Sequence, residues 1–375
     1  MVTSHHLLSD DLGQILNESL QNVYHQEGLP SLSALLVKDD KILWHGTVGY
    51  ADLEQKRRAD DQTIYGIGSI TKVFTALMLL QLWDAHKLAL DEPVARYLPE
   101  LKQLPTGAAI TFRQLASHTA GLPIMPPLPE LAEVMQEFPP TIESLRQMRF
   151  PTGQQVLALL PLVTPLSAPG AQVAYSNLGV ALLTYALERI AGQPYVAYVM
   201  EHILQPLGMV HSGFAAETLP AVHLATCYLP FTTPPVAAPT QMKDIQGFVA
   251  TGALNASGGD MARFLIGLFA NAQSTILSSR SRHAMIQPVA HLSASRYTNR
   301  PTPGGVGIGW FLSSYRNHVI LEHGGADPST AAYLAYVPNL GLGVFAATNT
   351  GNPTAVATMA ADFLELIITH LETDG

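Results

Sequence analysis

Segments typical of β-strands lie at both ends of the chain, and a long stretch of helical pattern separates them. Near the N-terminus, two apolar runs at 32–37 and 42–52 flank the turn Lys-Asp-Asp-Lys, a pattern that predicts a hairpin. Near the C-terminus, further runs are typical of strands at 307–315, 318–323, 331–338 and 342–349. Because an isolated hairpin has little stability and exposed edges, we expect it to join the C-terminal strands in one antiparallel sheet.

A helix is predicted next to the strands at each end of the chain. Apolar residues in 12–24 recur at helical spacing, and Gly28 follows as a stop signal. The second helix is predicted at 354–371, with Pro353 near its first turn. We expect both helices to cover one face of the sheet.

The helical middle of the chain predicts a second domain inserted between the two ends. A chain of 375 residues is too long for one ordinary hydrophobic core, and 13% charged residues against an average of ~25% indicates a large interior. We predict an α+β fold with a discontinuous α/β domain, residues 1–65 and 300–375, and a mainly helical inserted domain, residues 66–299. The functional site is expected in the cleft between them.

Charge, cysteine content and hydropathy argue against several classes of function. The net charge of −9, with no run of lysine or arginine, argues against nucleic acid and anionic membranes as partners. The single Cys227 excludes an internal disulfide framework, and without H-E-x-x-H or paired cysteines we expect no metal site and no cofactor.

The same absences bear on localisation. No uninterrupted apolar run reaches the ~18 residues of a membrane span, and the N-terminus has neither the basic nor the apolar region of a signal peptide. We expect a cytoplasmic protein without a membrane span. A signal peptide that had already been removed would leave the same residues.

One serine and one lysine stand out in the apolar run of residues 66–82. A buried ammonium without a partner costs several kcal/mol, so Lys72 needs a counter-charge or loses its proton. Ser69 precedes it by three residues and shares its helical face. Gly66 and Gly68 place Ser69 in the first turn, where free N–H groups favour negative charge. A hydroxyl, a proton acceptor and oxyanion donors are what an acyl-transfer nucleophile needs.

The competing interpretation of this pair is a core serine beside a lysine that extends to solvent. A phosphate loop and a G-x-S-x-G nucleophile turn are both absent. Downstream, Tyr175 and Asn177 precede an apolar helix predicted to begin near Leu178, where each is compatible with a cap or a packing ring. Residues 322–327, Glu-His-Gly-Gly-Ala-Asp, follow a predicted strand, where the glycines form a turn or let a substrate approach the backbone.

Taken in order, these motifs resemble those of the serine β-lactamase and penicillin-binding-protein superfamily. They are Ser69-x-x-Lys72, Tyr175-x-Asn177 and residues 323–325, His-Gly-Gly. The Y-x-N form and the spacing are similar to the branch of class C β-lactamases, DD-peptidases and esterases. Further matching stretches are LASHTAGLP at 115–123, GVGIGW at 305–310 and ASGGDMARFL at 256–265. We expect His118 to be a structural hydrogen-bonding residue of its loop and Asp260 to cap the following helix.

The resemblance implies a role for each matching residue. Ser69 is the nucleophile that forms an acyl-enzyme, and Tyr175 is the proton shuttle, acidified by Lys72. Asn177 positions Lys72 and the substrate. His323, Gly324 and Gly325 form the substrate-positioning strand. The backbone N–H groups of Ser69 and Ala326 bind the oxyanion.

The histidine of the third motif departs from the usual pattern, because β-lactamases and peptidases usually have lysine there. An imidazole with an ordinary pKa near 6.5 is mostly neutral at pH 7. Binding of a substrate carboxylate should weaken, so neutral esters become better substrates than lactams. We therefore expect a serine hydrolase acting on a small ester.

Several alternatives use the same residues. They are a peptidase or amidase, a β-lactamase or DD-peptidase, a biosynthetic acyltransferase or thioesterase, and a non-enzymatic sensor that acylates slowly. The complete set Ser69, Lys72, Tyr175 and Asn177 argues against the sensor. The expected partner is a small ester or amide molecule, and the oligomeric state is left open.

Overall fold

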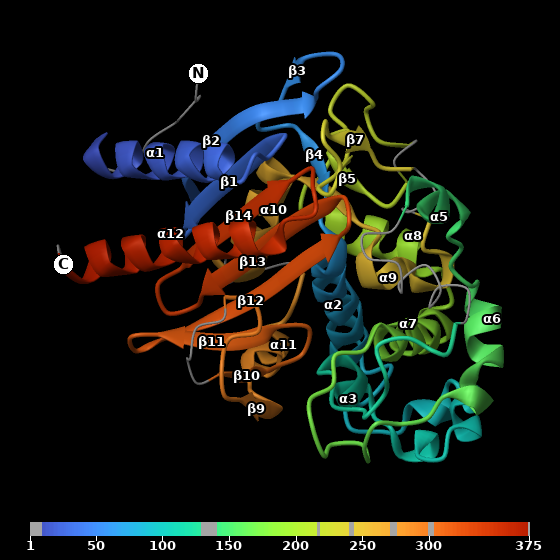
Figure 1. Ribbon diagram of the computed structural model, residues 1–375. Coiled ribbons are helices and arrows are strands. Elements are labelled where there is room, and N and C mark those ends of the chain that lie inside the picture. Colours follow the sequence, from blue (N-terminus) through green and yellow to red (C-terminus); the bar gives the residue numbers. More distant parts are fainter. Residues whose placement is uncertain are drawn as a thin grey trace.

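The computed structural model describes residues 10–128, 141–215, 218–239, 244–270, 276–298 and 304–373. Its main feature is a sheet in which the N-terminal hairpin pairs with the C-terminal strands (Figure 1). Strand β1 (Ser31–Lys38) runs antiparallel to β14 (Leu342–Thr348), with Leu32 opposite Thr348. The predicted discontinuous antiparallel sheet is therefore confirmed.

The strand order in the described sheet is β3-β2-β1-β14-β13-β12-β11-β10-β9. The bounds of the other strands are β2 Lys41–Asp52, β3 Arg57–Arg58, β9 Ala290–Leu292, β10 Gly304–Val306, β11 Phe311–Tyr315, β12 His318–Asp327 and β13 Thr330–Val337. Every residue of β13 and β14 is buried, so the centre of the sheet is covered on both faces.

The two terminal helices cover one face of this sheet, as predicted. They are α1 (Asp10–Gln26) and α12 (Pro353–Thr373), and Figure 1 shows them side by side across the strands. Side chains of β1 alternate between two cores: Leu32, Ala34 and Leu36 pack under these helices, whereas Leu35 and Val37 face the core that contains α2. Because successive side chains of a strand point to opposite faces of the sheet, this one strand contributes to both cores.

Helix α2 (Thr71–Asp84) joins the sheet to the helical part of the molecule. Nearly all of its side chains are buried, and it packs against α7 (Asn177–Ala191), α8 (Tyr195–Val199) and α9 (Val249–Gly252). The remaining α-helices are α3 Phe112–Ala116, α5 Ile142–Gln147, α6 Gly153–Ala158, α10 Gly258–Leu265 and α11 Ser279–Ile286. The smaller strands are β4 Ile64–Gly66, β5 Ser212–Gly213, β6 Tyr228–Leu229, β7 Val236–Ala237 and β8 Asn255–Ser257.

The predicted α+β class is confirmed, whereas the division at residue 300 stays a prediction. Strand β9 lies N-terminal to that boundary and still pairs with β10 at the edge of the sheet. Helix α10 also lies in the range predicted to be the helical insertion, and it packs against β1 and β14.

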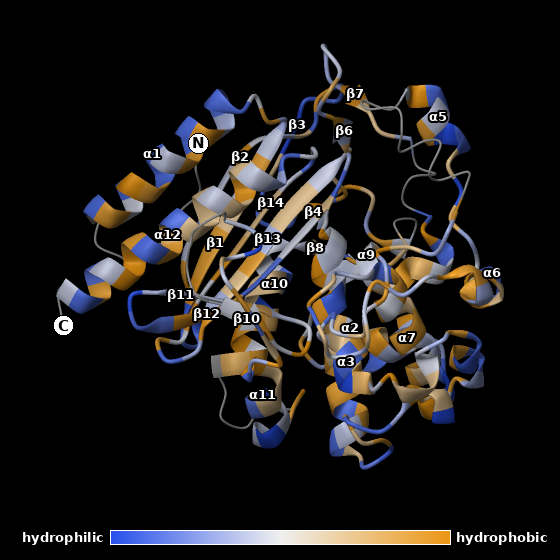
Figure 2. Ribbon diagram, turned by 60° about the horizontal axis from the view of Figure 1, so that its bottom comes forward, coloured by the Kyte–Doolittle hydropathy of each residue, from blue (hydrophilic) through white to orange (hydrophobic). Residues whose placement is uncertain are grey.

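Helix α12 bears on the expectation that the chain has no membrane span. Among the described helices it alone is long and apolar enough to cross a membrane by length and composition, and half of its most apolar window is buried inside the protein. It carries hydrophobic and hydrophilic residues along its length (Figure 2). Burial against β13 and β14 accounts for its hydrophobic side as core packing. The cytoplasmic localisation stays a prediction.

Candidate active site

Ser69 and Lys72 lie at the start of α2, in a turn that three hydrogen bonds hold in place. Gly68 adopts a positive φ of 49°, which lets the chain turn sharply into the 3₁₀ turn Gly68–Ile70 before the helix begins. The Thr71 hydroxyl donates to Gly68 O at 2.7 Å and accepts from Leu254 N at 3.1 Å. Lys72 Nζ lies 2.8 Å from Ser69 Oγ, so the structure brings the predicted pair together.

The environment of Lys72 favours its neutral amine. The side chain is 2% exposed, and its nitrogen also donates to Thr251 O at 2.6 Å. Burial lowers the pKa of Lys72 well below its usual value, and the nearby Arg296 lowers it further. A neutral amine at this distance from Ser69 Oγ can accept the serine proton.

The backbone of strand β12 crosses directly beside Ser69. A Cβ on Gly325 would lie 1.9 Å from Ile67 O and 2.8 Å from Ser69 N, and a Cβ on Gly68 would lie 2.7 Å from Ala326 N. The two segments of the chain can approach this closely only because residues 68 and 325 are both glycine. The backbone N–H groups of Ser69 and Ala326, the predicted oxyanion donors, therefore belong to two segments in direct contact.

Tyr175 lies beside both members of the pair. Lys72 Nζ lies 5.0 Å from the centre of the Tyr175 ring, and Ser69 is near enough to lower the pKa of the phenol. Burial raises the pKa of Tyr175 to about 12, and the groups that oppose this rise are Ser69 and Arg296. Burial therefore outweighs these neighbours, and the acidification of Tyr175 by Lys72 stays a prediction. Tyr175 is thus a neutral phenol, suited to donating a proton.

The segment before α7 fixes the position of Tyr175. Ser176 caps the helix by accepting from Gly179 N at 2.8 Å, and its own N–H donates to His118 Nδ1 at 3.2 Å. The His118 ring lies 4.5 Å from the Tyr175 ring, centre to centre. Burial lowers the pKa of His118 well below its usual value, so the ring is a neutral acceptor. His118 thus makes a hydrogen bond of the kind predicted for it, and its purely structural role stays a prediction.

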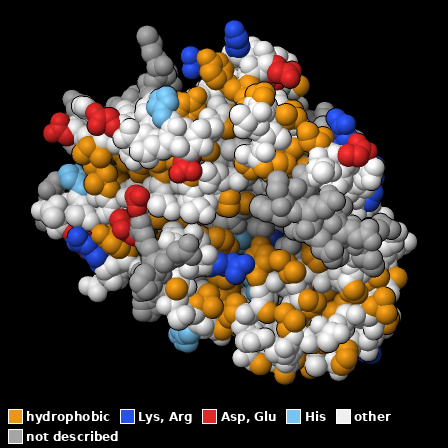
Figure 3. All heavy atoms as spheres, viewed as in Figure 1, with side chains coloured by type: hydrophobic (Ala, Val, Ile, Leu, Met, Phe, Trp, Pro, Cys, Tyr) orange, Lys and Arg blue, Asp and Glu red, His pale blue; other side chains and the backbone are white. Residues whose placement is uncertain are grey.

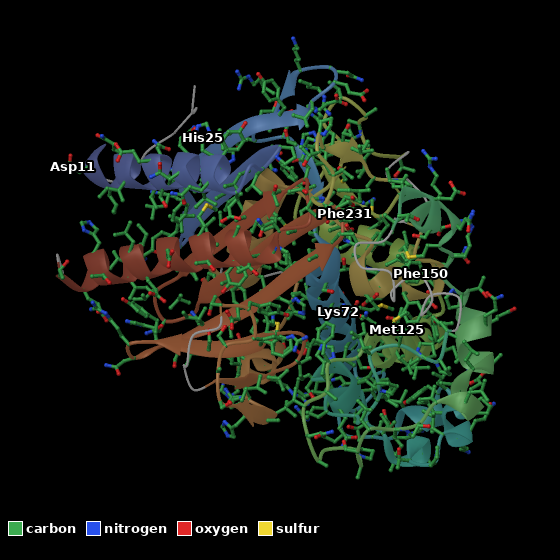
Figure 4. All side chains as sticks on the ribbon, in the orientation of Figure 1. Asp11, His25, Lys72, Met125, Phe150 and Phe231 are labelled. Carbon is green, nitrogen blue, oxygen red and sulfur yellow. The ribbon has the colours of Figure 1, made fainter. Side chains whose placement is uncertain are left out.

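Asn177 does not make the expected contact with Lys72. Its amide nitrogen lies 3.8 Å from the sulfur of Met125, and its buried Oδ1 has no partner among the described residues. Figure 4 labels Lys72 on α2 and Met125 on the adjoining loop. Contact of Asn177 with a substrate stays a prediction.

His323 lies inside β12 rather than in a turn after it. Its Nδ1 lies 2.8 Å from Gly324 O, which can only accept, so Nδ1 carries the proton and Nε2 is an acceptor. Nε2 is buried and without a partner in the described part of the chain. Burial, with Lys72 and Arg296 nearby, lowers the pKa of His323 to about 3. The imidazole is neutral at pH 7, as expected from the sequence.

Two further features differ from expectation or were not expected at all. Ser257, not Asp260, caps α10, and Asp260 instead accepts from His211 N at 2.6 Å and from the Ser212 hydroxyl at 2.9 Å. Arg296, which no motif singled out, lies 4.4 Å from the Tyr175 ring centre. Its place beside Tyr175 can be seen only in the folded structure, because the residues around it in the sequence match no known motif.

Metal-binding residues do not cluster in the described part of the chain, where no group of three or more His, Cys, Asp or Glu side chains could hold an ion. The arrangement instead places a serine hydroxyl, a buried amine and a phenol together, beside a close contact between the two segments that carry Ser69 N and Ala326 N. These are the parts of an acyl-transfer site.

Comparison with known proteins agrees with this geometry. The family model described as Beta-lactamase matches residues 16–367, nearly the whole chain. The chain belongs to the Beta-lactamase family. The solved structures with a similar fold include a class C beta-lactamase. Its TM-score is 0.76, and it is 19% identical over 96% of this chain and 98% of that chain.

A more similar solved structure is the octameric penicillin-binding protein homologue from Pyrococcus abyssi. It shares 26% identity and a TM-score of 0.79, over 95% of this chain and 77% of that chain. Protein flp of Staphylococcus aureus (strain MW2) is 23% identical over 98% of this chain and 67% of its own length. The chain therefore spans about two thirds of that curated relative. These matches confirm the resemblance to β-lactamases and penicillin-binding proteins.

Proposed function

We propose that the protein is a serine hydrolase that cleaves a small carboxylic ester through an acyl-enzyme. The observation that carries the proposal is the distance of 2.8 Å between Lys72 Nζ and Ser69 Oγ, together with the burial that lowers the pKa of Lys72. A purely structural serine needs only a hydrogen-bond donor beside it, whereas a nucleophile needs a base at this distance, and an amine with a lowered pKa supplies one.

The first half of the proposed reaction makes the acyl-enzyme. Ser69 Oγ attacks the ester carbonyl carbon while its proton passes to Lys72 Nζ. The carbonyl oxygen becomes an oxyanion that accepts from the N–H groups of Ser69 and Ala326. When the ester C–O bond breaks, Tyr175 donates its phenolic proton to the departing alkoxide, and Lys72 returns its proton to Tyr175.

The second half reverses these steps with water in place of the alcohol. Lys72 accepts a proton from the water as its oxygen attacks the acyl carbon, and passes that proton to Ser69 Oγ as the acyl–serine bond breaks. Each general acid or base step of this kind contributes roughly 10²–10⁴-fold. Atoms balance as ester plus water giving acid plus alcohol.

The preference for an ester rests on the third motif. With the pKa of His323 lowered to about 3, strand β12 carries no positive side chain where lysine usually lies in β-lactamases. We propose that lactams, whose recognition there depends on a cation, are turned over more slowly than activated esters.

The test uses Ser69→Ala. We expect it to abolish both hydrolysis of p-nitrophenyl esters and covalent labelling by a fluorophosphonate probe, while circular dichroism and the Tm stay close to wild type. Ser19→Ala, on α1 beyond the sheet, is the matched control and should keep both activities. Assays with nitrocefin and D-alanyl peptides run alongside. Undiminished labelling of Ser69→Ala, or faster turnover of nitrocefin than of every ester by wild type, would contradict the proposal.

A further inference from the structure

Two neighbouring carbonyl groups at the end of α9 accept from side chains of α2. Ala250 O lies 2.9 Å from the Thr75 hydroxyl, and Thr251 O lies 2.6 Å from Lys72 Nζ. The last carbonyls of a helix have no partner within it, and α9 is a single turn, Val249–Gly252. Lys72 and Thr75 lie three residues apart on one face of α2. The end of α9 is thus held by the same helix face that carries Lys72.

The Thr75 hydroxyl also contacts a buried phenol. Tyr195, the first residue of α8, places its hydroxyl 3.0 Å from Thr75 Oγ1, and both side chains are at most 1% exposed. A hydroxyl has a single proton, and Ala250 O can only accept, so Thr75 donates to Ala250 O. Burial raises the pKa of Tyr195, which therefore keeps its proton and donates it to Thr75. The chain of hydrogen bonds runs from Tyr195 through Thr75 to α9.

Tyr195 is itself fixed on two sides. Its backbone N–H donates to Glu188 Oε1 at 2.7 Å, which joins α8 to α7, and its ring centre lies 5.4 Å from that of Phe214 in an edge-on contact. Helices α2, α8 and α9 pack against one another, and Figure 1 shows them together beside the sheet. A buried polar chain whose members are all satisfied makes the arrangement of such helices rigid. The position of α9 is therefore fixed from α7 through α8 and α2.

Lys72 depends on hydrogen bonds for its orientation. The charged side chain that perturbs its pKa among the described residues is Arg296, a cation, and Figure 3 shows few charged side chains over the helical part on this face. A neutral amine has two N–H groups and one lone pair, and Thr251 O takes one of the N–H groups. The lone pair can then face Ser69 Oγ, 2.8 Å away, where the proposed reaction needs a base.

We propose that Thr75 is a positioning residue for Lys72 and that Tyr195 supports it. Thr75 holds the carbonyl end of α9 where Thr251 O accepts from Lys72, and this leaves the lone pair of Lys72 for the Ser69 proton. The proposal rests on the proposed function, in which Lys72 is the base, and it adds two residues that act only through Lys72. Neither Thr75 nor Tyr195 belongs to the three sequence motifs.

The test removes the hydroxyl of Thr75 and keeps its shape. Thr75→Val cannot donate to Ala250 O, whereas Thr75→Ser keeps the donor and loses a methyl group. Thr184→Val is the matched control, because Thr184 is similarly buried in α7 and its hydroxyl donates to Val180 O at 2.9 Å within its own helix. Each full-length variant is labelled with a fluorophosphonate probe across the pH range in which it stays folded. Rates are normalised to the folded fraction measured by circular dichroism.

We expect the maximal labelling rate to fall by about 10- to 100-fold in Thr75→Val and to stay within about 3-fold of wild type in Thr75→Ser. Labelling needs the neutral amine of Lys72, and a carbonyl stabilises the ammonium more than the amine. Release of Thr251 O therefore lowers the pKa of Lys72, and the midpoint of the pH profile should move to lower pH in Thr75→Val. Thr184→Val should lower the Tm without either change. Loss of packing alone has the opposite signature, because water that enters a loosened site raises the pKa of Lys72.

Tyr195→Phe tests the outer end of the chain and is the milder change. It leaves Thr75 its own proton for Ala250 O, so the labelling rate should fall by only about 2- to 10-fold, with a midpoint at lower pH. Combined with Thr75→Val it should add no further loss, because Tyr195 acts through Thr75. Additive losses would overturn the part assigned to Tyr195. If Thr75→Val does not fold, Tyr195→Phe alone decides, and a wild-type profile would overturn the proposal.

A folded Thr75→Val with the labelling profile of wild type overturns the proposal, as do equal losses in Thr75→Ser and Thr75→Val. Failure of the proposed function has a different signature, because wild type is then not labelled at Ser69. In that case the titration of Lys72 is followed directly by NMR of protein with isotope-labelled lysine, with Lys72→Gln to assign the signal. A lower midpoint in Thr75→Val supports the positioning role, and an unchanged or higher one overturns it.

Discussion

Gly325→Ala perturbs the contact between strand β12 and the turn that carries Ser69, and its effect can be estimated from the structure. The added Cβ would lie 1.9 Å from Ile67 O, whereas real Cβ atoms essentially never come within 3.0 Å of such an atom. The two backbones must therefore separate by about 1 Å. A shift of about 1 Å at a reacting centre can cost on the order of 100-fold in rate.

The separation acts on the predicted oxyanion donors in particular. The same Cβ would lie 2.8 Å from Ser69 N, so relief of the clash moves Ser69 N away from Ala326 N. A change in the spacing of the two predicted donors weakens their hydrogen bonds to the oxyanion, and each such donor is worth a few kcal/mol of transition-state stabilisation. We expect the second-order rate constant for fluorophosphonate labelling to fall by about 100-fold or more.

Gly107→Ala is the matched control for the steric clash itself. Its added Cβ would lie 1.8 Å from Leu101 O, a similar overlap with a backbone carbonyl, in a turn of the helical part. Overpacking of this size costs roughly 1–3 kcal/mol of stability, so both variants should have a lower Tm. Only Gly325→Ala should lose labelling, with rates normalised to the folded fraction measured by circular dichroism. Labelling of folded Gly325→Ala within about 3-fold of wild type would refute the close-contact oxyanion site.

Two further substitutions test the protonation states of the site. Tyr175→Phe should slow hydrolysis of alkyl esters by about 10²–10⁴-fold and of p-nitrophenyl esters much less, because p-nitrophenolate leaves without a proton; equal losses would assign Tyr175 to the attack step. Burial lowers the pKa of His323 from 6.5 to about 3, so the unfolded state binds the extra proton in this window. The free energy of unfolding should therefore fall as pH is lowered from 6.5 towards 3, and less steeply in His323→Asn; identical pH slopes in urea titrations would show that His323 is not buried as a neutral base.

Local patterns in the sequence were enough to predict the frame of the fold. Alternation of apolar residues predicted the strands, and the instability of an isolated hairpin predicted its pairing with the C-terminal strands, as β1 and β14 show. The neighbourhood of Ser69 and Lys72 could be predicted for the same reason, because residues three apart share a helical face. Each of these inferences concerns neighbours in sequence or the requirement that a sheet edge be paired.

Other features depend on contacts between distant segments, which no local pattern encodes. Residues 323–327 looked equally compatible with a turn, but pairing with β13 keeps them in strand β12. Asp260 has the chemistry of a cap, yet the backbone of His211 competes for its carboxylate and leaves the cap to Ser257. The protonation states of Lys72 and Tyr175 follow from burial, which the sequence can suggest for a helix but cannot measure for one side chain.

The placement of charge in the site shows why one motif position could not settle the substrate. The histidine of the third motif predicted a neutral group on β12, and the expectation that neutral esters are the better substrates treated that strand as the only source of charge. The fold adds Arg296 from the β9–β10 loop and holds that loop to β12 through Ser295 and Glu322. A cation on a loop can be gained or lost by a change of loop sequence without disturbing the strand that carries Ala326, one of the two predicted oxyanion donors. In this chain the loop therefore places a positive charge beside Tyr175 independently of the strand that carries His323.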